Sequence, residues 1–182
     1  MASNRPPDLR RLDVAAFAAA GGELAGAWPA ADLRRLASAT IEPAPDDVAW
    51  RVGGERLALA GAGVLPTLRV EATTAVTLEC QRCLQPMRWP LEARRRIFFV
   101  DGEDAAAALD ADHDDDVLAL APTLDLPSLV EDELLLSLPI VPRHEVCPEP
   151  LPRAFADEDE AGAAEASPFA ALAALKRGPA PS

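Results

Sequence analysis

The fold of this chain is decided by the stretch from Leu68 to Phe99, which reads LRVEATTAVTLECQRCLQPMRWPLEARRRIFF. Apolar and polar residues alternate through residues 68–79, and the alternation resumes through residues 87–99 with Arg95 as its one breach. A period of two residues is typical of a strand that buries one face. The Gln-, Arg- and Pro-containing segment 79–86 between the two runs predicts the turn of an antiparallel hairpin.

Further elements are predicted on either side of this hairpin. Alternating apolar residues between positions 48 and 59 indicate a second hairpin that turns at Gly53-Gly54. Helices are expected at residues 32–38 and 127–138, the second with Ser128 and Glu131 at the spacing of a capping box. Turn-separated strands and late helices favour an α+β class, in which an antiparallel β-sheet or partial barrel is packed by a few helices.

The chain length of 182 residues fits one domain with tails. We expect an N-terminal segment at 1–30, an α+β core domain at 31–150, an acidic linker at 151–166, and a C-terminal helix and tail at 167–182. Such a short terminal helix is marginal alone. Its apolar side must therefore dock, either on the chain's own domain or on a partner, and the sequence leaves both open.

Charge is unevenly distributed along the chain, whose net charge is −13. Acids crowd the stretch 101–116, which contains no Lys or Arg and is predicted to be a mobile loop. A cation site is the alternative, but the glycine and terminal glutamate of a calcium hand are missing. His113 within this stretch is expected to be solvated. A chain this anionic repels nucleic acid, so RNA binding would need a local basic patch.

Composition and motifs restrict compartment and activity. Three cysteines, no signal-peptide pattern and no apolar run approaching 18 residues favour a soluble protein of the reducing cytoplasm, without membrane attachment. The sequence has two histidines and lacks a Gly-rich phosphate loop and a nucleophile elbow. We therefore expect neither enzymatic activity nor a small-molecule substrate.

Two short motifs carry metal-ligand chemistry. A redox Cys-x-x-Cys is expected to start a helix, whereas a strand follows Cys80 and Cys83, so the redox interpretation is disfavoured. His144 and Cys147 have the same internal spacing just after the second predicted helix. Together the four residues would make a closed Cys₃His site of the kind that zinc occupies structurally. The long separation between the pairs leaves inert or solvent-facing thiols as the alternative.

Three motifs in register carry a resemblance to a known family. They are TLECQRC at residues 77–83, VEDELLLSLPIVPRH at 130–144 and SPFAALAALK at 167–176. In order and spacing they resemble the bacterial large ribosomal RNA subunit accumulation protein family, YceD, over roughly residues 30 to 177. The resemblance implies a role in the synthesis, processing or stability of 23S ribosomal RNA. It implies no catalytic reaction and does not establish zinc.

Two kinds of partner are compatible with such a role. Arginines at the tip and outer face of the first hairpin would contact phosphates of 23S rRNA or of a large-subunit precursor: Arg82, Arg88, Arg94 and Arg96. The alternative is that these arginines pair with cross-strand acids such as Glu71 and Glu79. The second kind of partner is a basic ribosomal protein, which the net charge and the acidic stretch would suit if the chain is an adaptor.

Overall fold

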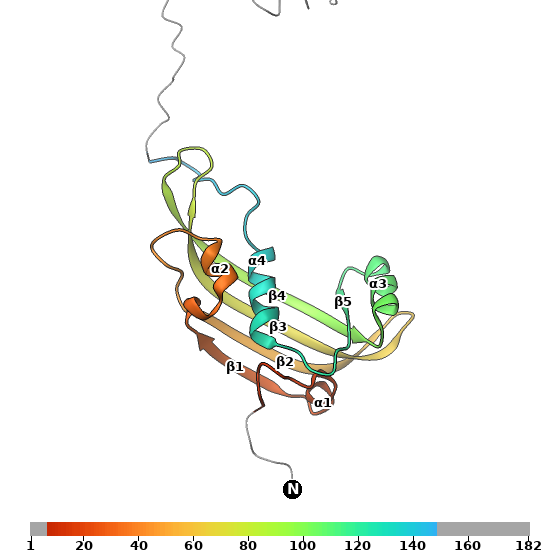
Figure 1. The fold of residues 1–182 in the computed structure, drawn as a ribbon. Helices are drawn as coiled ribbons and strands as arrows, with labels where there is room; N and C mark the ends of the chain where they lie inside the picture. The colour runs from red at the N-terminus through yellow and green to blue at the C-terminus, as the bar shows by residue number, and fades with distance from the viewer. Residues whose placement is uncertain (1–6, 149–182) are drawn as a thin grey trace, which may run out of the picture. The chain divides into compact units, whose positions relative to one another are not determined.

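The computed structural model describes residues 7–148 of the chain. A five-stranded sheet runs through them in the order β1-β2-β3-β4-β5 (Figure 1). Strands β1 to β4 pair antiparallel, and β5 pairs parallel with β4. The strands are β1 (Glu23–Trp28), β2 (Val48–Leu59), β3 (Gly63–Glu79), β4 (Pro86–Val100) and β5 (Asp116–Ala119). The α+β class is confirmed, and the sheet is open rather than closed into a partial barrel.

The central hairpin lies where the alternation predicts it. Strand β3 ends at Glu79 and β4 begins at Pro86, with Val76 opposite Trp89 in the register. The apolar positions of both strands are mostly buried, which confirms the half-buried hairpin. Arg95 lies opposite Val70, on the face that the core occupies. The breach in the alternation therefore marks a charged residue on the inner side of the sheet.

The predicted turn at Gly53-Gly54 is wrong, because β2 runs unbroken past both glycines and the chain turns after Leu59. A Cβ atom on Gly54 would lie 2.6 Å from the Phe17 ring and 3.0 Å from the Ala18 backbone. Gly54 is thus needed for the close approach of a helix to the strand, not for a turn.

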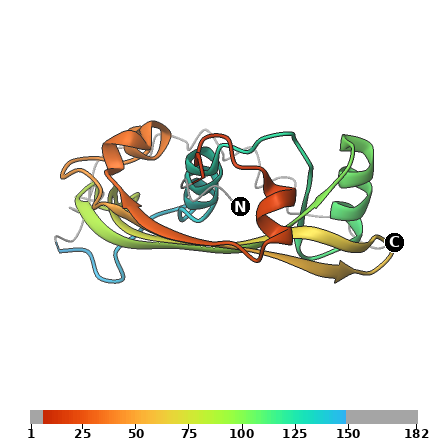
Figure 2. The ribbon, with the colours of Figure 1, turned by 90° about the horizontal axis from the view of Figure 1, so that it is seen from below.

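Helices cover the inner face of the sheet. They are α1 (Val14–Ala19), α2 (Arg34–Ser38) and α4 (Leu126–Leu136), with the 3₁₀ turn η1 (Ala30–Asp32) before α2. Figure 2 shows the three helices on one side of the sheet. Their residues Val14, Leu36 and Leu134 join one buried cluster with the inner residues of β2, β3 and β4. The helix expected at 32–38 is thus divided between η1 and α2.

Helix α4 does not begin with the predicted capping box. The carboxylate of Asp125 accepts the backbone N–H of Ser128 at 3.1 Å and caps the helix, and Pro127 lies in the first turn. Glu131 does not reach back to the helix start, because its carboxylate is turned toward α2. The helix also ends two residues before the predicted end, at Leu136.

The acidic stretch 101–116 is not the mobile loop that its charge predicted. Residues Glu103–Asp112 form helix α3, and β5 begins at Asp116. The alanines that interrupt the acids give the helix an apolar side, and Ala106 packs with Phe98, Val117 and other residues in a second cluster at the end of the sheet. His113 lies with Nε2 3.0 Å from the Ala60 carbonyl oxygen and is not freely solvated.

The N-terminal segment expected at 1–30 supplies α1 and β1, which joins the sheet through β2. The acidic linker at 151–166 and the C-terminal helix and tail at 167–182 lie outside the described residues. Between residues 7 and 148, the chain forms no helix with the length and apolarity that a membrane span needs.

Candidate metal centre and its surroundings

The structure brings Cys80, Cys83, His144 and Cys147 together in one cluster. Their sulfur and ring nitrogen atoms all lie within 4.8 Å of one another. The Cys80 and Cys147 sulfurs are 4.0 Å apart, and the Cys83 sulfur lies 3.4 Å from His144 Nδ1. Cys80 and Cys83 are buried, while Cys147 is partly accessible. Two distant segments thus contribute one compact set of donor atoms.

The β3–β4 turn positions the first pair. The backbone N–H of Cys80 donates to the Gln85 carbonyl at 3.0 Å, and the N–H of Leu84 donates to the Cys80 carbonyl at 2.8 Å. Leu84 adopts a left-handed conformation with φ of 60°, which closes the turn tightly. These contacts turn both cysteine side chains toward the inner side of the hairpin tip.

The segment that leaves α4 positions the second pair. It runs back beside the hairpin turn (Figure 1), where the Gln81 N–H donates to the Pro142 carbonyl at 2.9 Å. Arg82 fixes the following residues, since its terminal nitrogen donates to the His144 carbonyl at 2.9 Å and its Nε donates to the Cys147 sulfur at 3.0 Å. Arg82 therefore holds the cluster together from the turn.

The cluster favours the thiolate form of Cys80. Burial opposes ionisation of Cys80, but backbone N–H groups of His144, Cys83 and Arg82 stabilise its thiolate and lower the pKa of Cys80 to about 5. Burial raises the pKa of Cys83. Three sulfurs and one imidazole are the donors that closed structural metal sites use, and a thiolate is the form that binds. The Cys₃His group can therefore hold a metal ion.

The four arginines proposed for RNA binding all have partners in the structure. Arg82 belongs to the cysteine cluster, Arg88 forms an ion pair with Asp46, Arg94 with Glu92 at 2.6 Å, and Arg96 with Asp115 at 3.4 Å. These acids are not Glu71 and Glu79, which form no ion pair among residues 7–148. The side chains of the last three arginines remain between 40% and 74% exposed.

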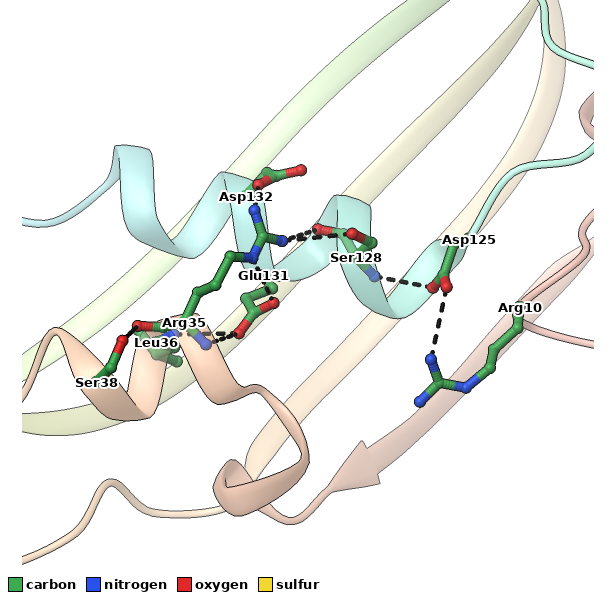
Figure 3. Close-up of polar contacts among 8 residues, drawn as sticks. All are labelled: Arg10, Arg35, Leu36, Ser38, Asp125, Ser128, Glu131 and Asp132. Carbon is green, nitrogen blue, oxygen red and sulfur yellow. Dashed lines mark hydrogen bonds and ion pairs between the residues drawn. The ribbon is translucent and has the colours of Figure 1, made fainter.

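A second polar centre, which no sequence motif predicted, lies between α2 and α4 (Figure 3). The buried carboxylate of Glu131 accepts the backbone N–H groups of Arg35 at 2.6 Å and Leu36 at 3.1 Å. It also accepts Arg35 Nε at 2.9 Å, and Asp132 contacts the same guanidinium. Because Leu33 at the start of α2 gives no side-chain cap, Glu131 caps that helix from across the core. No sequence signal indicated this contact, because the spacing of Ser128 and Glu131 assigns Glu131 to a capping box of its own helix.

Arg95 meets an acid on the inner side of the sheet. Its Nε lies 3.1 Å from a carboxylate oxygen of Glu133, which is 6% exposed. Burial raises the pKa of Glu133, while the charge of Arg95 acts in the opposite direction. The arginine that breaks the strand alternation thus connects β4 to α4, and the breach itself was the signal that could have found this pair.

Comparisons with known proteins agree on one family. The sequence model of the family described as "Large ribosomal RNA subunit accumulation protein YceD" matches residues 68–176. A curated protein of the same description from Haemophilus influenzae is 30% identical over 174 residues, covering 92% of this chain and 90% of the relative. No solved structure matches the chain. The matched range contains β3 from Leu68 onward, the whole of β4 and all four residues of the cysteine cluster.

Proposed function

Because the chain belongs to the YceD family of large ribosomal RNA subunit accumulation proteins, we propose that it supports the accumulation of 23S rRNA in the bacterial cytoplasm. It acts without catalysing a reaction, by binding the rRNA or a large-subunit precursor. The contact surface is the outer face of the sheet around β3 and β4. The proposal is supported by the name of the relative from Haemophilus influenzae, "Large ribosomal RNA subunit accumulation protein YceD".

The observation that carries the proposal is the uncovered row of arginines on that outer face. Arg69, Arg94 and Arg96 are exposed and point away from the face that α1, α2 and α4 cover. Arg69 and Arg96 are directly opposite each other in the β3–β4 register. Neighbouring guanidinium groups on adjacent strands suit the closely spaced phosphates of RNA.

The ion pairs of these arginines do not prevent phosphate binding. Their side chains are about half exposed or more, and exposed ion pairs contribute only about 0–1 kcal/mol each. An RNA phosphate can therefore replace the carboxylate at small cost. The released acids remain nearby, so we expect a moderate affinity that depends on salt.

Zinc is the metal that we propose for the cluster of Cys80, Cys83, His144 and Cys147. A closed set of three sulfurs and one imidazole fits zinc better than magnesium or calcium, which prefer oxygen donors. The metal would join the hairpin tip to the segment that follows α4. Its role is structural, since it stabilises the end of the sheet that borders the proposed RNA surface.

The acidic adaptor remains the second candidate function, and one observation favours it. Helix α3 presents an ordered row of exposed acids, which includes Glu103, Asp104 and Asp110. An ordered anionic helix is a better complement to a basic ribosomal protein than a mobile loop would be. In that case the chain acts on 23S rRNA through a protein that it delivers or protects.

Crosslinking in cells, followed by sequencing of the attached RNA, tests the proposal. Direct binding predicts enriched 23S fragments on the purified chain after denaturing washes. A variant with Arg88, Arg94 and Arg96 changed to glutamine should lose most of these fragments, whereas Arg56→Gln on β2 should keep them. Recovery of protein partners without 23S fragments would instead favour the adaptor.

A further inference from the structure

We propose that two adjoining cavities between the N-terminal arm (residues 7–13), η1 and α4 bind one nucleotide of single-stranded RNA. The phosphate lies against arginines in the first cavity, and the base lies beside Trp28 in the second. We call the two cavities together the N-terminal groove. The inference rests on the proposed function, because it takes RNA as the ligand, but it places the contact far along the chain from the hairpin.

The first cavity gathers guanidinium groups. Its volume is about 430 Å³, and its lining includes Arg10 from the N-terminal arm, Arg34 and Arg35 at the start of α2, and Asp32. Figure 3 shows Arg10 beside Asp125 at the start of α4, and Arg35 beside Ser128 and Asp132 further along that helix. Arg34 forms no ion pair within residues 7–148, although the carboxylates of Asp32 and Glu131 line the same cavity. This cavity can therefore accept an anionic group.

The second cavity offers an aromatic surface. Its volume is about 240 Å³, and it is lined by Trp28, Leu9, Leu33 and Pro127 together with Arg10 and Asp32. Because Arg10 and Asp32 line both cavities, the two are neighbours. The Trp28 ring stacks on Trp50 with centroids 4.4 Å apart and an interplanar angle of 20°. A ring held in this way is a rigid platform for a base, and stacking on aromatic side chains is how proteins hold unpaired bases.

The nearby acids decide how strong this contact can be. Glu131 is compensated by two backbone N–H groups and Arg35, Asp132 also contacts Arg35, and Asp125 lies 3.5 Å from Arg10. Arg35 is therefore already committed, whereas Arg34 forms no ion pair within residues 7–148. Arg10 can exchange its exposed pair with Asp125 for a phosphate at small cost. Asp8 and Asp32 carry the charge that opposes an anion. Asp32 can accept a hydrogen bond from a ribose hydroxyl or a base amino group, which makes it useful to a nucleotide and unfavourable to a bare phosphate.

Two properties of the cavities favour single-stranded RNA as the ligand. A base inside a duplex is stacked on both sides and cannot lie beside Trp28, whereas an unpaired base can. The arginine cavity and the aromatic cavity share two residues, which matches a ligand whose anionic and planar parts are joined. A short unpaired segment of rRNA provides this combination.

The test uses the full chain and a short single-stranded RNA that contains 4-thiouridine. Irradiation should crosslink the thiobase to the tryptic peptide 12–34, which contains Trp28, as measured by mass spectrometry. In fluorescence anisotropy, Arg34→Gln should weaken binding about tenfold, the loss expected for one charged hydrogen-bonded contact. Arg56→Gln removes the same charge from an exposed site on β2 and should change binding less than about twofold.

Several results would contradict RNA binding in the N-terminal groove. Equal binding by Arg34→Gln and Arg56→Gln, or crosslinks confined to hairpin peptides, would contradict it while leaving the proposed function intact. Equal crosslinking of free 4-thiouridine monophosphate and of the RNA would assign the groove to free nucleotides. If the wild-type chain binds no RNA in these assays, direct RNA binding through the outer sheet face fails as well. Trp28→Phe keeps an aromatic ring and should retain the crosslink, so its loss in a variant that still folds would contradict stacking on residue 28.

Discussion

Replacing Glu131 with alanine should cost this protein about 2–4 kcal/mol of unfolding free energy. The carboxylate is 7% exposed and accepts the backbone N–H groups of Arg35 and Leu36 at the start of α2. Removing it leaves two donors without partners, and water has poor access to the Leu36 N–H because that contact is buried. Loss of a helix cap costs about 0.5–2 kcal/mol, and an unsatisfied buried donor costs about 1–3 kcal/mol.

Asp132→Ala provides the matched control. Asp132 contacts the same Arg35 guanidinium from the next position in α4, but its side chain is 48% exposed. Exposed ion pairs contribute little, so this variant should lose less than about 1 kcal/mol. Glu131→Gln keeps an acceptor oxygen for the backbone N–H groups without the charge, and its stability should lie between those of wild type and alanine variant.

Urea unfolding followed by circular dichroism measures these differences directly. For a chain of this size the Glu131→Ala loss corresponds to a fall of roughly 4–16 °C in melting temperature. If Glu131→Ala and Asp132→Ala differ by less than about 0.5 kcal/mol, the carboxylate does not cap α2 across the core.

Three further outcomes follow from the same structure. Purified without an affinity tag, the chain should carry about one equivalent of zinc, and both a chelator and Cys80→Ser should lower its melting temperature; less than about a tenth of an equivalent would exclude the metal. The triple variant Arg88→Gln, Arg94→Gln and Arg96→Gln should fold normally, bind large-subunit precursors more weakly and show a salt slope shallower by about two, whereas unchanged binding would refute the arginine surface. Burial raises the pKa of Glu133 above its usual 4.5 although Arg95 opposes the shift, so the folded state holds this proton more tightly than the unfolded state does. The stability that this proton provides is therefore present below pH 4.5 and is lost as pH rises through the raised pKa, and Glu133→Gln should flatten that dependence in urea midpoints measured from about pH 4 to 7.

The sequence by itself determined the central hairpin and the fold class. Alternation through β3 and β4 specifies which face is buried, because a shift of one residue would expose every apolar side chain. Local rules also located helix α4 within two residues at its C-terminal end. The same local rules wrongly predicted a turn at Gly53-Gly54. A glycine needed for a close helix contact, as Gly54 is, has the same appearance in sequence as one that forms a turn.

Only the tertiary structure decided the contacts between distant segments. The spacing of each cysteine or histidine pair suggested a shared site, but the convergence of both pairs depends on how residues 139–147 return along the hairpin tip. Glu131 reaches Arg35 across 96 positions, and Arg10 lines the same cavity as Arg34. The acidic stretch 101–116 contains the ordered helix α3 because Ala106 of that helix packs into an apolar cluster at the end of the sheet. Sequence patterns record which residues a local element buries, whereas the packing of elements determines which side chains from different parts of the chain meet.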